Sequence, residues 1–121
     1  MTISEYQKKA MLTCMETCDN FAYMSTGLIG EIGEFYGKIA KAIRKDKAMV
    51  DFNALVTERG AQSMSESEIS VLKAELGDTM WFCAGICSVM DWDLEEICDD
   101  NLAKLESRRR RGVIDGNGDE R

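Results

Sequence analysis

The chain has 121 residues, of which 45% are apolar, and its formal net charge at neutral pH is −7. This acidic balance argues against a broad attraction to nucleic acid polymers or anionic membranes, although four consecutive arginines, residues 108–111, form one local exception. The length is typical of a single domain, and the absence of proline together with abundant alanine, leucine, glutamate and lysine favours helix over strand. We therefore predict an all-α fold, with residues 1–121 forming one domain.

The first residues, MTISEYQKKA, lack the apolar segment of a signal peptide, and the longest apolar run, residues 79–90, is too short to span a bilayer. These features predict a cytoplasmic protein with no membrane partner. The chain has no histidine and five cysteines, and the spacing of Cys14 to Cys18 and of Cys83 to Cys87 fits neither a zinc knuckle nor a disulfide framework. We interpret the cysteines as reduced core residues, with a thiol redox switch or a soft-metal site as the alternative.

Two helices are predicted in the first 45 residues. The first covers about residues 4–23 and the second about residues 25–45, because apolar side chains recur along each at helical spacing. The second contains Gly30, Gly33 and Gly37, and a glycine inside a helix costs roughly 1 kcal/mol relative to alanine. The three glycines therefore predict close approach by a neighbouring helix or by a ligand.

The helical period fades over residues 46–64, which we interpret as a connector with one short helix. A third helix is predicted from a serine cap at position 65 or 67 to about residue 90, with acidic residues in its first turn. A fourth helix begins at Asp91 or Asp93 and ends in the arginine run before Gly112. Residues 112–121 form a polar, glycine-rich tail. Four helices of this kind predict a domain that resembles a four-helix bundle.

The most informative feature is a pair of acids inside an apolar segment. Glu75 and Asp78 are the only charged residues between positions 74 and 90, and their spacing of three places both on one face of a helix. Unpaired carboxylates are rarely buried, since removing them from water costs on the order of several kcal/mol, so a metal ion is the obvious compensation. Glu31 and Glu34 repeat the spacing in the second helix. Two helices thus offer four oxygen ligands to one site, and hard carboxylate oxygens favour Mg²⁺ or Mn²⁺.

The acid pairs also have a structural alternative. Glu31 and Glu34 lie in line with Lys38, Lys41 and Lys45, so this pair also fits a solvated stripe with an ion pair between Glu34 and Lys38. The third helix does not fit that alternative, because apolar residues continue the face that carries Glu75 and Asp78. These apolar residues are Phe82, Ile86 and Val89.

Polar groups continue the apolar stripe of the fourth helix. Asn101, Lys104 and Arg108 share a side with Leu94 and Ile97, and this arrangement suits a phosphate. The alternative is that cations in the last turns of a helix stabilise its negative end, and that long basic side chains extend past apolar neighbours into water. The helix alone leaves both interpretations open.

Three segments together resemble one family. They are GLIGEIGEFYGKIAKAIRK, LKAELGDTMWFCAGI and NLAKLESRRRRGVIDGNGDER, which cover most of the chain. They are similar to the MazG-like nucleoside triphosphate pyrophosphohydrolases, an all-α family whose metal-binding pattern is E-x-x-E on one helix and E-x-x-D on the next. In this chain the pattern maps to Glu31, Glu34, Glu75 and Asp78.

The resemblance implies an enzyme that uses Mg²⁺, or Mn²⁺ in its place, to cleave a ribo- or deoxyribonucleoside triphosphate between the α- and β-phosphates. The products would be a nucleoside monophosphate and pyrophosphate. One carboxylate would act as general base for the attacking water, with Glu34 preferred over Glu31. Family members commonly assemble from short helical chains, so a homodimer or homotetramer is expected. The candidate substrate-binding residues are Lys38, Asn101, Lys104 and Arg108.

Two other functional classes compete with this assignment. A redox protein with a di-iron site in a helical bundle uses Glu-x-x-His pairs, and the chain has no histidine. A non-catalytic helical protein that senses a nucleotide or binds a partner would use the same ligands for metal and phosphate. A turnover measurement therefore separates the sensor from the enzyme.

Overall fold

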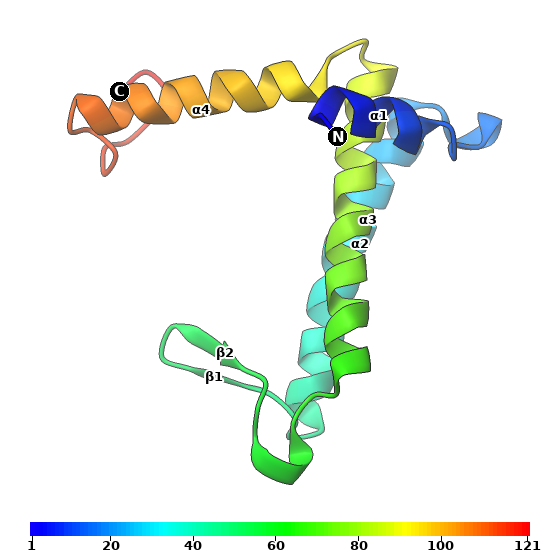
Figure 1. The fold of residues 1–121 in the computed structure, drawn as a ribbon, viewed down its shortest axis with the longest axis vertical. Coiled ribbons are helices and arrows are strands. Elements are labelled where there is room, and N and C mark those ends of the chain that lie inside the picture. The colour runs from blue at the N-terminus through cyan, green and yellow to red at the C-terminus, as the bar shows by residue number, and fades with distance from the viewer.

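The structure, a computed structural model, describes residues 1–121 except for the side chain of Ala61. Two short strands, β1 (Met49–Asp51) and β2 (Ala54–Val56), pair antiparallel, and 3₁₀ turns cover Glu16–Cys18 and Gly60–Gln62. No helix among the described residues is both long and apolar enough to cross a membrane. The all-α class is confirmed, because the chain is dominated by the helices in Figure 1, which are α1 (Ile3–Met11), α2 (Phe21–Arg44), α3 (Glu66–Val89) and α4 (Leu94–Arg110).

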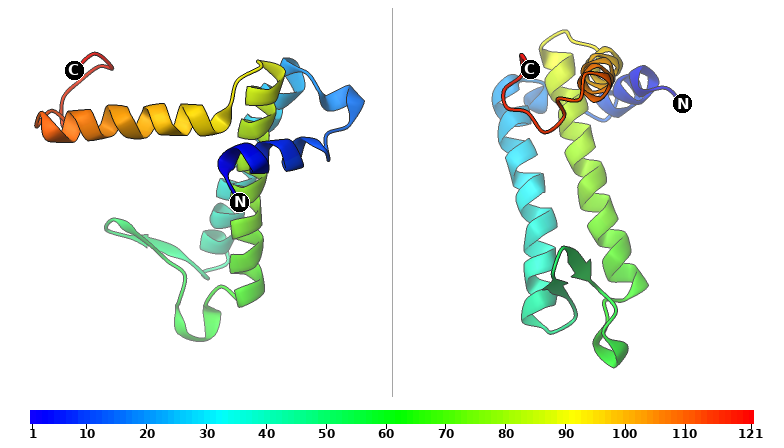
Figure 2. Two further views of the ribbon diagram at one scale, coloured as in Figure 1. Left: turned by 45° about the horizontal axis from the view of Figure 1, so that its top comes forward. Right: turned by 90° about the vertical axis from the view of Figure 1, so that its left-hand side faces the viewer.

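The long helices α2 and α3 lie side by side, run in opposite directions and form the axis of the molecule (Figures 1 and 2). Each begins at a side-chain cap. The Asn20 Oδ1 atom accepts a hydrogen bond from the Tyr23 N–H at 2.8 Å, and the Ser65 Oγ atom accepts one from the Glu68 N–H at 3.0 Å. The Glu68 carboxylate accepts the Ser65 N–H in return, which completes a capping box. The predicted third helix and its serine cap at position 65 are therefore confirmed.

Two glycines let α2 and α3 approach closely. The Phe82 ring lies against Gly27, and the Met24 side chain lies against Gly85, so that a Cβ atom at either glycine would overlap its neighbour. Met24 is fully buried and Phe82 is buried as well. Because protein interiors are close-packed, an added methyl group at either position would displace a core side chain or separate the helices.

The close approach predicted at Gly30, Gly33 and Gly37 is wrong for a neighbouring helix of the same chain. Apart from the neighbouring backbone of α2 itself, no atom among the described residues lies within 4 Å of a Cβ built at any of the three. Helix propensity identifies glycines that carry a cost, but it does not say which one meets a neighbour. The three glycines instead leave a stretch of α2 open to a ligand or to another chain.

The predicted extent of the first helix is wrong, because α1 is much shorter than expected. The helix ends at Met11, and a 3₁₀ turn separates it from α2. At the end of α1, the Ala10 carbonyl accepts hydrogen bonds from the Thr13 hydroxyl at 2.7 Å and from the Trp81 indole N–H at 3.1 Å. Such side-chain bonds compete with the helical pattern, and Asn20 then caps a new helix.

The connector contains a β-hairpin that was not predicted, and its short helix is the 3₁₀ turn at Gly60–Gln62. Val50 pairs with Leu55 and Met49 with Val56, and Phe52 takes a positive φ of 56° at the turn. A positive φ is uncommon for an aromatic residue, but it reverses the chain within a two-residue turn. Each strand has only 3 residues, which is too short for an alternating pattern to be recognised in the sequence.

Hydrogen bonds from α1 fix the direction in which α4 extends from the helical core. The Gln7 Oε1 atom accepts a hydrogen bond from the Leu94 N–H at 2.8 Å, and its Nε2 atom donates to the Trp92 carbonyl at 2.9 Å. The Ser4 hydroxyl donates to the carboxylate of Asp93, the N-cap of α4, at 2.9 Å. Of the two predicted starts of this helix, Asp91 and Asp93, the structure has Asp93 as the cap. Beyond this anchored turn, α4 extends sideways, away from the α2 and α3 pair (Figures 1 and 2).

Two core clusters lie at opposite ends of the α2 and α3 pair. At the end near α1, Ala84 and Cys87 of α3 pack against Ala10 and Leu94. The cluster near the hairpin contains Ala42, Ala48, Met64 and Leu72. The middle of the helix pair lies between these apolar clusters, and it is this middle section that carries the predicted acid pairs.

Candidate metal centre

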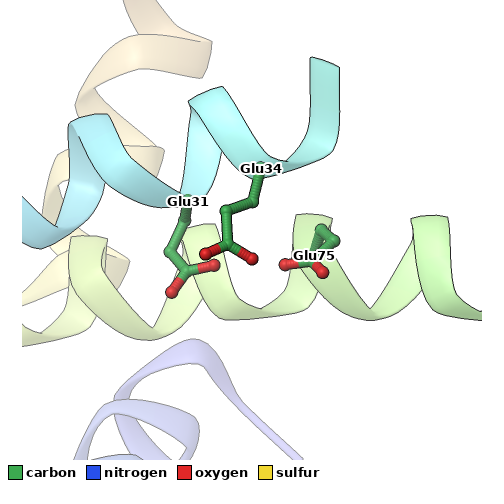
Figure 3. A group of neighbouring side chains, drawn as sticks. All are labelled: Glu31, Glu34 and Glu75. Carbon is green, nitrogen blue, oxygen red and sulfur yellow. The ribbon is translucent and has the colours of Figure 1, made fainter. Parts of the chain in front are cut away.

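Three carboxylates meet between α2 and α3. Glu31 and Glu34 come from α2 and Glu75 from α3, and one oxygen of each lies within 4.8 Å of the others. Figure 3 shows the three side chains pointing toward one another between the two helices. Glu75 is buried, with 8% of its surface exposed, Glu31 is half-buried and Glu34 is exposed. The structure therefore brings together three of the four predicted metal ligands.

The electrostatics of the group are those of crowded negative charge. Partial burial raises the pKa of Glu31, and the negative charges of Asp78, Glu34 and Glu75 raise it further, as does a hydrogen bond to Glu75. The Lys38 Nζ atom lies 2.8 Å from Glu75 Oε1, and this hydrogen bond raises the pKa of Lys38. Lys38 is the only cation in an ion pair with these acids among the described side chains.

Lys38 pairs across the helices, so the ion pair between Glu34 and Lys38 that the solvated-stripe alternative requires does not form. Lys38 contacts Glu75 of α3 instead. A single ammonium leaves the acids with a net negative charge, and the donor set consists of hard carboxylate oxygens. These donors fit Mg²⁺ or Mn²⁺, which prefer oxygen ligands, better than a soft metal.

Asp78 lies one helical turn after Glu75 and its side chain is exposed. It is not part of the compact group of three carboxylates. Its negative charge nevertheless raises the pKa of Glu31. It also raises the pKa of Tyr6, although burial is the larger cause there. Asp78 therefore lies close enough to the group to add to its negative potential.

The candidate phosphate ligands of α4 lie apart from the acids within one chain. Asn101 and Lys104 are exposed on the part of α4 that extends away from α2 and α3 (Figure 1). Arg108 is 4% exposed because residues 112–121 fold back over it. Its Nη2 atom donates to the backbone carbonyl of Asp119 at 2.9 Å and to Asp119 Oδ1 at 3.1 Å.

Comparison with known proteins assigns the family. The sequence profile of the MazG nucleotide pyrophosphohydrolase domain matches residues 20–113, a range that contains both acid pairs and all of α4. The chain belongs to the MazG family. The Gene 37 protein of Mycobacterium phage L5 is 35% identical over 106 residues, which cover 88% of this chain and 81% of the phage protein. No solved structure gives a significant match.

The MazG-family match ends at residue 113 and leaves out most of the tail. The folded structure of this tail was not predicted from the sequence. The Arg121 guanidinium donates to the backbone carbonyls of Val113 and Ile114, among others, and Lys104 Nζ lies 3.6 Å from Asp119 Oδ1. The neighbouring cations of α4 lower the pKa of Asp119. The available signal was the pair of glycines at 112 and 118, which take positive φ values of 69° and 77° and let the chain turn back.

Sequence reasoning also missed a groove beside the acid group in this MazG domain. It has a volume of about 280 Å³ and lies between the last turns of α2 and the first turns of α3. Lys38, Lys41 and Lys45 line its α2 side, whereas only Lys38 was predicted to bind substrate. The spacing of these lysines already placed them in one line along the second helix, but that line was interpreted as a solvated stripe.

Proposed function

We propose that the chain hydrolyses nucleoside triphosphates, ribo- or deoxyribonucleotides, between the α- and β-phosphates in the presence of Mg²⁺ or Mn²⁺. Membership of the MazG family supports nucleotide pyrophosphohydrolase activity in general. The observation that carries the more specific proposal is the meeting of Glu31, Glu34 and Glu75 between two helices. We take residues 1–121 as one functional domain, with residues 112–121 as its tail.

Glu31, Glu34, Glu75 and Asp78 are proposed to hold the cation, which when bound neutralises charge on the phosphates. Glu34 is the proposed general base, because its carboxylate is exposed while Glu75 is engaged by Lys38. In this role Glu34 accepts a proton from the water whose oxygen attacks the α-phosphorus. The bond from that phosphorus to the bridging oxygen breaks, and the oxygen leaves with pyrophosphate. Lys38 then stabilises negative charge on the departing group.

The test is to incubate the purified protein with a panel of ribo- and deoxynucleoside triphosphates and Mg²⁺ and to identify the products by chromatography. We expect a nucleoside monophosphate and pyrophosphate, and we expect excess chelator to abolish the reaction. Nucleoside diphosphate and orthophosphate as first products would contradict the assigned bond, and full activity in chelator would contradict the metal. Metal-dependent nucleotide binding without turnover would favour the sensor.

We further propose that the chain assembles as a homodimer or homotetramer. Ile29 and Tyr36 of α2 are 73% and 62% exposed, and Leu102 of α4 is 65% exposed. Large apolar side chains on two helices, beside the open glycines of α2, favour burial against a second copy in so short a chain. A second copy would also offer its own α4 as a neighbour for the acid group. Light scattering after size exclusion should give a mass of two or four chains, and a monomeric mass at micromolar concentration would contradict assembly.

A further inference from the structure

The groove between α2 and α3 has a base of core residues and a positively charged wall. Ala42 and Met64 line it, and both belong to the buried cluster near the hairpin, so the base of the groove is part of the core. Lys38, Lys41 and Lys45 form its wall on α2. On the opposite side lies the first turn of α3, and the positive end of a helix favours anions.

The charges that face the groove are unevenly compensated. Glu68 of α3 also lines it, but Lys47 Nζ lies 2.9 Å from the Glu68 carboxylate and neutralises it. Lys38 is paired with Glu75. Lys41 and Lys45 have no ion pair among the described residues. Two cations without counter-charges therefore face the groove, and an anion would compensate them.

Lys38 connects this groove to the acid group. It lines the groove and contacts Glu75, so the two sites are continuous. With a rise of about 1.5 Å per residue, Lys41 and Lys45 lie roughly 4.5 and 10.5 Å beyond Lys38 along the helix axis. Cleavage between the α- and β-phosphates requires the α-phosphate at the acid group. The remaining phosphates can then follow the lysines toward the hairpin end, which leaves the nucleoside on the side of α1.

We propose that this groove binds the β- and γ-phosphates of the substrate, with Lys41 and Lys45 as the residues that select triphosphates over diphosphates. The proposal rests on the proposed function, since it assigns a direction to the substrate in the same site. It also makes inorganic pyrophosphate, the leaving group, a ligand of the groove. The affinity for phosphate chains then depends on their length rather than on the base.

The test compares K41M, K45M and the double variant with the unchanged protein, on a nucleoside triphosphate and on the matching diphosphate. We expect each single variant to lower kcat/KM for the triphosphate about fivefold and the double variant more than tenfold, with a smaller fall for the diphosphate, which lacks the γ-phosphate. R44M is the matched control, because Arg44 is an exposed cation of the same helix end that does not line the groove. A triphosphate preference that survives in the double variant would overturn the proposal.

Titration calorimetry with inorganic pyrophosphate and Mg²⁺ separates failure of the groove from failure of the proposed function. If the unchanged protein turns over no nucleotide but binds pyrophosphate, and the double variant weakens this binding more than tenfold, the groove assignment stands and the catalytic one fails. If turnover is normal and pyrophosphate binds equally to both proteins, the groove assignment fails and the catalytic one stands. If R44M weakens pyrophosphate binding equally, the effect comes from the overall charge of the protein and not from the groove. That result would overturn the proposal.

Discussion

Replacing Glu75 by glutamine or Asp78 by asparagine is expected to abolish most turnover. Both substitutions keep the size of the side chain and remove a negative charge from the proposed cation site. Glu75 is the buried member of the three-carboxylate group, and Asp78 adds to the potential at Glu31. Loss of either charge therefore weakens cation binding where the phosphate charge must be neutralised. Steady-state kinetics at several Mg²⁺ concentrations measure the effect, which we expect as a fall in kcat of roughly a hundredfold or more.

The same variants are expected to be no less stable than the unchanged protein when no metal is present. Four neighbouring carboxylates repel one another, and among the described side chains only Lys38 forms an ion pair with them, so removing one charge relieves repulsion. A glutamine at position 75 can still accept the hydrogen bond from Lys38. Thermal melts in chelator test the sign. Because a structural ion pair would lose stability on the same change, a large loss in both variants would reject the metal site.

Asp100 provides the matched control for Asp78. It is an exposed aspartate on α4, outside the acid group. The D100N substitution removes the same charge from a surface position, and surface changes of this kind usually alter stability by about 0.5 kcal/mol or less. Normal turnover in D100N together with inactive D78N would show that the position of the charge matters, not the overall charge of the protein.

The meeting of Glu31, Glu34 and Glu75 was predictable because charged residues stand out in an apolar segment. An acid in a segment that is otherwise apolar must be compensated, whatever the tertiary structure is, and Glu75 is indeed buried. The caps of α3 and α4 were predictable for a similar reason, since the capping bonds are local. By contrast, the ion-pair partner of Lys38 could not be predicted. Helical spacing offers only partners on the same helix, and the structure supplies Glu75 from another one.

The direction of α4 also could not be predicted from the sequence pattern. The periodicity places Asn101, Lys104 and Arg108 on one side with Leu94, but it does not state how far that side stays covered. Leu94 is buried against α1 and α3, whereas Ile97 is 43% exposed because α4 has already left the core. Periodicity defines a face of a helix, and only the tertiary contacts of its first turn define where the rest of the helix points.

The residues of α4 give the last prediction, in which substrate binding and helix stabilisation lead to different outcomes. K104M and R108M keep much of the apolar stem and remove the charge. If the two cations only stabilise the negative end of α4, each substitution should cost about 0.3–1 kcal/mol of stability and leave the kinetics nearly normal. If they contact the triphosphate, kcat/KM should fall roughly tenfold or more per site, because a charged hydrogen bond is lost. We expect the second result.

The tail allows a sharper distinction for Arg108, whose guanidinium is held by Asp119. D119N removes the negative charge that competes with a phosphate for Arg108 and Lys104. If Arg108 acts on the substrate, D119N should keep or raise kcat/KM while R108M lowers it. If Arg108 acts only by anchoring the tail, both variants should lose the same amount. R110M, which removes an exposed arginine from the same turns, is the control. If K104M and R108M both retain the unchanged kcat/KM, these residues leave the proposed site, and phosphate binding then rests on Lys38 and the lysines of the groove.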